Sequence, residues 1–195
     1  MTSTSRHASE TRGLKIALAA YSTIFVLQLV TYLVTGILVL FAQALEVLGD
    51  VLVSTFLLIS LFWSQKPADA FYMFGRGRTQ NVAALVSSIV FISFMSLEVF
   101  RQAIEKFLQP STSEFQDVNL GLIVIMISML VLAIPMIDIL RLKTRGASAK
   151  AGLVQLLKDE ISYVPALIGV YLVGQGYYLA DALTSMIIGV IIVVG

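Results

Sequence analysis

The sequence predicts an all-α membrane protein, a bundle of six transmembrane helices with both chain termini in the cytoplasm. Its composition indicates the membrane, because 58% of the 195 residues are hydrophobic and only 13% are charged. Soluble domains have roughly 45–50% apolar and about 25% charged residues. The mean hydropathy is +0.92, and the net charge of +1 provides no basic surface for nucleic acid. Soluble enzymes and nucleic-acid-binding proteins are therefore excluded.

Six apolar stretches predict the transmembrane helices, since a helix needs about 20 mostly apolar residues to cross a bilayer. They run over residues 14–35, 37–63, 81–108, 118–142, 149–173 and 178–195. Polar or turn-forming residues separate each stretch from the next. We expect residues 1–13 to form a flexible cytoplasmic tail ahead of a membrane domain over 14–195. The last stretch is short, so we expect a truncated sixth helix and the loss of a domain beyond it.

The connections between these stretches differ in length and character. Only Thr35 and Gly36 separate the first two stretches, which predicts an antiparallel helical hairpin. The third stretch ends in a turn-rich run over residues 109–113, and the fifth ends in the Gly-Gln-Gly turn at 174–176. No secretory signal precedes the first stretch, which is too long for the apolar region of a signal peptide. The first helix is therefore expected to stay in the membrane.

Lysine and arginine residues concentrate at one end of the predicted bundle, and such an excess is typical of cytoplasmic loops. They precede the first stretch or lie between the second and third or the fourth and fifth: Arg6, Arg12, Lys15, Lys66, Arg76, Arg78, Arg141, Lys143, Arg145 and Lys150. The opposite end has the acidic Glu114 and Asp117, with Arg101 and Lys106 as its nearby cations. This asymmetry places both termini in the cytoplasm.

Two pairs of polar residues lie where a membrane helix should be apolar. Glu46 and Asp50 are four residues apart in the second stretch, and Gln155 and Asp159 repeat this spacing in the fifth. Each pair therefore shares one helix face. A carboxylate at the bilayer centre costs at least about 2.5–3.5 kcal/mol. A lone buried acid is explained by protonation or by a hydrogen bond to another helix, whereas two matched pairs of hard oxygen donors favour a divalent-cation site.

Other acidic residues have simpler explanations. Glu160 lies beside Lys158, which indicates an interfacial ion pair or a solvated helix face. Glu98 has Arg101 three residues further on, at the spacing of a pair within one helix. The chain has no cysteine and a single histidine, which excludes disulfides, thiol nucleophiles and the usual Cys/His zinc sites.

With these features the chain resembles the transmembrane domain of the cation diffusion facilitator family, from the first stretch to the last residue. The two polar pairs stand where the family has a His/Asp-x-x-x-Asp motif on its second and fifth helices. Further segments match family motifs in the same order: Lys-Pro-Ala-Asp at 66–69, Phe-Gly-Arg-Gly-Arg at 74–78, Ala-Ala-Leu at 83–85, Ala-Ile-Glu-Lys-Phe-Leu-Gln-Pro at 103–110, Leu-Ile-Gly at 167–169 and Ala-Asp-Ala at 180–182.

The resemblance implies an antiporter that exports a divalent metal ion from the cytoplasm in exchange for protons by alternating access. It implies metal ligands at Glu46, Asp50, Gln155 and Asp159. The metal ion and protons would be substrates rather than cofactors, and the protein would be a homodimer in the plasma membrane. Because Gln155 does not titrate, we expect proton coupling to run through the three carboxylates.

Two departures from the family pattern bear on the metal. The family commonly has histidines at the positions of Glu46 and Gln155, and oxygen ligands there favour Mn²⁺ or Fe²⁺, while the general affinity order keeps Zn²⁺ possible. In the loop after the second helix, Asp69 is retained but Tyr72 and Arg76 replace the histidines of a second family site. We therefore expect no metal in that loop.

Two other functions stay open. Loss of the family's histidines is also what decay into a non-transporting metal sensor or scaffold would produce, although three acidic residues remain at the site. A membrane enzyme is the third interpretation, but no Ser/His pair, His-x-x-Glu motif or phosphate-binding loop accompanies the carboxylates. We therefore expect a transporter and not an enzyme.

Overall fold

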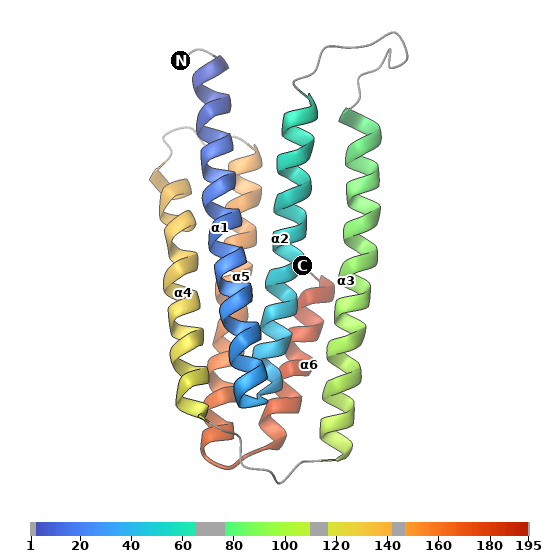
Figure 1. Cartoon of the computed structure of the whole chain (residues 1–195), viewed down its shortest axis with the longest axis vertical. Coiled ribbons are helices and arrows are strands. Elements are labelled where there is room, and N and C mark those ends of the chain that lie inside the picture. Colours follow the sequence, from blue (N-terminus) through green and yellow to red (C-terminus); the bar gives the residue numbers. More distant parts are fainter. Residues whose placement is uncertain (1–2, 65–76, 110–116, 142–146, 195) are drawn as a thin grey trace.

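The computed structural model describes residues 3–64, 77–109, 117–141 and 147–194, and these ranges form six helices in an up-and-down bundle (Figure 1). The helices are α1 (Ser3–Thr35), α2 (Leu38–Ser64), α3 (Gly77–Leu108), α4 (Val118–Arg141), α5 (Ala147–Gly174) and α6 (Leu179–Val194). Successive helices run in opposite directions. The start of α1 lies at one end, and the α1–α2 and α5–α6 turns lie at the other, which we call the turn end.

The first helix differs from the prediction at its start. It begins at Ser3 rather than Leu14, so most of the segment expected as a flexible tail continues the helix. Adding a residue to an existing helix is far easier than starting a new one, which explains how polar residues extend α1 beyond its apolar part. At its other end α1 stops at Thr35, and Gly36 adopts a positive φ of 71° before α2 begins. The predicted helical hairpin is thus confirmed.

Three helices are long and apolar enough to cross a membrane within the described ranges: Lys15–Thr35, Leu38–Phe56 and Val118–Asp138. The α6 helix is apolar but shorter. In α5 the apolar sequence is interrupted by the three consecutive charged residues at 158–160. Six helices are therefore confirmed, whereas the count of six membrane crossings and the cytoplasmic position of the termini stay predictions.

The α2 helix lies inside the bundle, where it packs against α1, α3, α5 and α6. Its buried side chains join apolar residues of the other helices in one core. The outer faces carry large exposed apolar side chains such as Leu33, Leu97 and Leu130, as expected for surfaces that meet lipid. Gly169 permits a close approach of α5 and α6, because a Cβ atom there would lie 2.5 Å from Thr184 Oγ1.

Candidate metal site

The two predicted pairs face each other across the contact between α2 and α5. The exposed fractions of Glu46, Asp50 and Asp159 are only 5, 6 and 3%, so all three carboxylates are buried. Gln155 Nε2 on α5 donates a hydrogen bond of 2.7 Å to Asp50 Oδ1 on α2. The structure therefore brings together residues 105 positions apart, which the spacing within each helix did not predict.

Each carboxylate has one oxygen held by a neighbouring side chain. Asp50 uses Oδ1 for the bond from Gln155. Asp159 uses Oδ2, which accepts a hydrogen bond of 2.8 Å from the hydroxyl of Tyr21 on α1. Such bonds fix the orientation of a carboxylate and leave its second oxygen available. Tyr21 thus adds a third helix to the site, although nothing in the sequence around it indicated this role.

Glu46 is held in the same way by two residues. Its Oε2 accepts hydrogen bonds from Ser162 Oγ at 2.9 Å and from Gln43 Nε2 at 3.2 Å. Gln43 lies one turn before Glu46 on α2, and Ser162 lies one turn after Asp159 on α5. Both residues extend the helix faces that the two pairs define.

The second oxygen of each carboxylate has no hydrogen-bond partner. These atoms are Glu46 Oε1, Asp50 Oδ2 and Asp159 Oδ1, and all three are buried. Buried polar atoms in proteins are hydrogen-bonded in the large majority of cases, so three such oxygens on two facing helices call for an explanation. We name Glu46, Asp50, Gln155 and Asp159 the carboxylate cluster.

A lysine lies within this cluster. Lys158 Nζ is 3.9 Å from Glu46 Oε1 and 3.7 Å from Asp159 Oδ1. The sequence had suggested Glu160 as the neighbour of Lys158, but these ion pairs are with the cluster. The reason is tertiary, because α2 and α5 pack so that Glu46 faces the turn of α5 that carries Lys158. Sequence reasoning missed this residue, although its position beside Asp159 was a signal.

The cluster does not form a closed coordination sphere. Within the described ranges, no three acidic or histidine side chains converge closely enough to hold one metal ion. Gln155 meets Asp50 through its amide nitrogen, a donor that cannot bind a metal. Binding of an ion by all four predicted ligands would therefore need the carboxylates to approach one another and the amide to present its oxygen.

A cavity of about 1020 Å³ adjoins the cluster. Its polar wall is formed by Glu46, Asp50, Gln155 and Lys158, and its other walls are apolar residues of α2, α3, α5 and α6. Space for a hydrated ion thus lies beside Glu46 and Asp50, whereas Asp159 does not line this cavity. The loop residues Asp69, Tyr72 and Arg76 lie outside the described residues, so the expected absence of a metal there stays a prediction.

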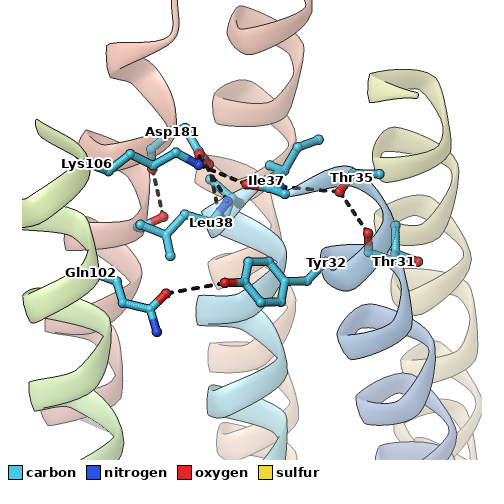
Figure 2. Close-up of polar contacts among 11 residues, drawn as sticks. Thr31, Tyr32, Thr35, Ile37, Leu38, Gln102, Lys106 and Asp181 are labelled. Carbon is cyan, nitrogen blue, oxygen red and sulfur yellow. Dashed lines mark hydrogen bonds and ion pairs between the residues drawn. The ribbon is translucent and has the colours of Figure 1, made fainter. Parts of the chain in front are cut away.

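Another buried carboxylate lies near the turn end (Figure 2). Asp181 on α6 has an exposed fraction of 0%. Its Oδ2 accepts hydrogen bonds from Leu38 N at 3.0 Å and Lys106 Nζ at 2.6 Å, and its Oδ1 accepts one from Val39 N at 2.9 Å. Lys106 Nζ also donates to Gly36 O at 2.9 Å. Asp181 therefore caps α2 from another helix, and we call Asp181, Lys106 and the start of α2 the turn-end clamp.

Comparison with known proteins identifies the family. The family model of the cation efflux transmembrane domain matches residues 14–195 of this sequence. The cation-efflux pump FieF of Salmonella paratyphi A is 27% identical over 176 residues, which are 90% of this chain and 58% of that pump. The same values hold for the pumps of this name from Salmonella agona and Salmonella newport, so the chain spans 58% of the length of these curated relatives. The chain belongs to the cation efflux family, the cation diffusion facilitators, and is an integral membrane protein.

Proposed function

We propose that this chain forms the membrane domain of an antiporter that exports a divalent metal ion from the cytoplasm in exchange for protons. The observation that carries the proposal is the set of three buried carboxylate oxygens of the cluster that accept no hydrogen bond. A protein keeps such costly atoms where they bind something. A divalent cation next to them would compensate both their charge and their missing hydrogen bonds.

The ligand chemistry favours a hard metal ion. The cluster has carboxylate oxygens, an amide and no histidine or cysteine. Oxygen ligands suit Mn²⁺ or Fe²⁺ better than nitrogen or sulfur ligands do. Zn²⁺ remains a second candidate, because it binds most ligand sets more tightly than either ion. The name of the Salmonella relatives, cation-efflux pump, supports export of a cation without specifying which one.

Exchange with protons follows from the same carboxylates. Ionised carboxylates bind a divalent cation and protonated carboxylates do not, so a bound cation favours the ionised form and added protons favour release of the cation. Metal and protons then exclude each other from the cluster. Gln155 has no titratable proton, so Glu46, Asp50 and Asp159 are the groups that would couple the two fluxes.

Alternating access needs the cluster to reach each side of the membrane in turn. The cavity beside the cluster gives one approach, and the turn-end clamp ties together α2, α3 and α6 on the side of the short turns. This arrangement is what an exporter waiting for cytoplasmic metal would have, given the predicted orientation. We further expect a homodimer in the plasma membrane, as in the family that the chain resembles.

The test is metal flux in proteoliposomes of the full-length protein, with Mn²⁺, Fe²⁺, Co²⁺, Zn²⁺ and Cd²⁺ offered separately and an internal pH dye. We expect metal influx with matched proton efflux, strongest for Mn²⁺ or Fe²⁺. Asp50→Asn should abolish both fluxes. Asp138→Asn is the matched control, because Asp138 is an exposed aspartate on α4, and it should leave both fluxes unchanged.

Other outcomes separate the alternatives. Preference for Zn²⁺ would keep the antiporter and overturn the ligand argument. Metal binding without flux, from protein shown to be folded, would favour the sensor or scaffold. Flux of metal without proton movement would contradict the coupling through the carboxylates.

A further inference from the structure

We propose that Lys158 is a tethered counter-cation of the transport site: its ammonium compensates Glu46 and Asp159 while no metal is bound, and an arriving metal ion displaces it. The lysine thereby lowers the affinity of the site for metal. This inference rests on the proposed function, because it assigns a role in metal transport to a residue outside the predicted ligands.

The atoms that meet the ammonium carry the inference. Lys158 Nζ approaches Glu46 Oε1 and Asp159 Oδ1, and these are the oxygens of the two carboxylates that no hydrogen bond uses. A metal ion bound to the cluster would need the same two atoms. The ammonium and the metal therefore compete for one position.

The geometry also allows the ammonium to leave. Its distances of 3.9 and 3.7 Å exceed those of a hydrogen bond, so the attraction is electrostatic and imposes no strict direction. The side chain of Lys158 is 29% exposed and lines the cavity beside the cluster. A lysine has a flexible four-carbon stem, so its ammonium can swing into that cavity while Glu46 and Asp159 stay buried.

The contrast with the other lysine that pairs with a buried carboxylate supports this assignment. Lys106 Nζ lies 2.6 Å from Asp181 Oδ2 and also donates to Gly36 O, which is the geometry of a fixed structural contact. Lys158 has two carboxylate neighbours at longer range instead. A cation that must yield its position to a substrate ion needs the second arrangement rather than the first.

Competition predicts the effect of removing the charge. Two positive charges a few ångströms apart repel strongly at the effective dielectric constant of a protein interior. Without the ammonium, the carboxylates would attract a divalent ion more strongly, so the affinity for metal should rise by roughly tenfold or more. Most other substitutions near a metal site lower affinity, which makes this direction diagnostic.

The experiment measures binding of Mn²⁺ to the full chain in detergent from the loss of the electron paramagnetic resonance signal of free Mn²⁺. Lys158→Met should bind Mn²⁺ at least about tenfold more tightly than the wild type, whereas Lys158→Arg should stay close to it. Lys15→Met is the matched control, because Lys15 is exposed on α1, and it should change nothing. Equal or weaker binding by Lys158→Met would overturn the proposal.

Two further measurements separate this inference from the proposed function. If the wild type binds Mn²⁺ and Asp50→Asn does not, the metal site stands whatever Lys158→Met does. If no variant binds Mn²⁺ or Zn²⁺, the proposed function fails, and the displacement by metal fails with it.

Metal-free thermal unfolding tests the counter-cation by itself. Lys158→Met should lower the melting temperature, because two buried carboxylates lose their compensation, and adding Glu46→Gln to it should restore part of the loss. No loss in Lys158→Met would contradict the role of counter-cation. Should Lys158→Met not fold, Lys158→Gln replaces it, since glutamine also removes the charge.

Discussion

Two regions of this molecule each bury acidic side chains beside a lysine, but the carboxylate oxygens are hydrogen-bonded differently in the two regions. In the turn-end clamp, both oxygens of Asp181 accept hydrogen bonds, one of them from Lys106 at 2.6 Å. In the carboxylate cluster, each acid has one oxygen that accepts no hydrogen bond, and Lys158 Nζ lies no closer than 3.7 Å to an acid oxygen. Both carboxylate oxygens are therefore engaged in the clamp, whereas one oxygen of each acid accepts no hydrogen bond in the cluster. The two regions differ in the state of the second carboxylate oxygen rather than in burial, and on the proposed function this difference separates a structural acid from a metal-binding one.

The difference also has an energetic side. Removing one partner of a buried, hydrogen-bonded ion pair destabilises the folded protein by about 3–5 kcal/mol. Acids grouped at a binding site repel one another until their ligand arrives, so neutralising one of them can leave stability unchanged or improve it. The two regions should therefore respond differently to the same substitution.

The largest expected effect comes from an aspartate-to-asparagine substitution in each region. Asp181→Asn should lower the free energy of unfolding by about 3–5 kcal/mol, because the amide nitrogen would face Lys106 or the backbone N–H groups of α2. Asp50→Asn should change it by less than about 1 kcal/mol. Unfolding in detergent, followed by circular dichroism, measures both. Comparable losses in the two variants would mean that the cluster is as structural as the clamp.

The lysines give the next largest contrast. Lys106→Met should cost about 2–4 kcal/mol of stability, since Asp181 is fully buried and would lose its charge partner. Lys158→Met should cost less, about 1 kcal/mol, because its longer and partly exposed ion pairs contribute less. The same unfolding assay ranks them. A larger loss for Lys158→Met than for Lys106→Met would reverse the assignment of the fixed and the displaceable cation.

Removal of one hydroxyl tests the orientation of the cluster. Tyr21→Phe removes the hydrogen bond that holds Asp159 Oδ2, and loss of such a supporting contact weakens metal binding by roughly tenfold. Tyr163→Phe is the matched control, since the buried hydroxyl of Tyr163 accepts a hydrogen bond from Gln28 and not from the cluster. Titration with Mn²⁺ should separate the two tyrosines. Equal affinities in both variants would remove Tyr21 from the site.

The smallest expected effect concerns Gln155. Gln155→Leu removes the hydrogen bond to Asp50, and we expect metal flux to fall about threefold, at the low end for the loss of one hydrogen bond, because the three carboxylates remain. The shape of the flux–pH profile should stay the same, because an amide has no proton to exchange. The comparison uses proteoliposome flux measured from about pH 5.5 to about pH 8, the range in which a histidine would titrate. A profile that depends on residue 155 would contradict proton coupling through the carboxylates alone.

Much of this protein was already predictable from local patterns. Hydropathy depends on composition over about 20 residues, so the six helices could be predicted, although the polar start of α1 was not. The four-residue spacing within each pair follows from the helical period, and it correctly placed Glu46 with Asp50 and Gln155 with Asp159. The ordered motifs identified the family, which the comparison then confirmed. Motifs over residues 65–76 lie outside the described part of the chain.

The tertiary structure decided which side chains complete each region. Tyr21 meets Asp159 across 138 positions, and Asp181 meets the start of α2 across more than 140. Lys158 is next to Asp159 in sequence, yet its second partner, Glu46, comes from another helix. The sequence by itself determined the helices and the faces on which their acids lie, because both follow from short-range periodicity. How the faces meet depends on the packing of whole helices, and this packing leaves one oxygen of each cluster acid without a hydrogen bond while both oxygens of Asp181 in the clamp accept one.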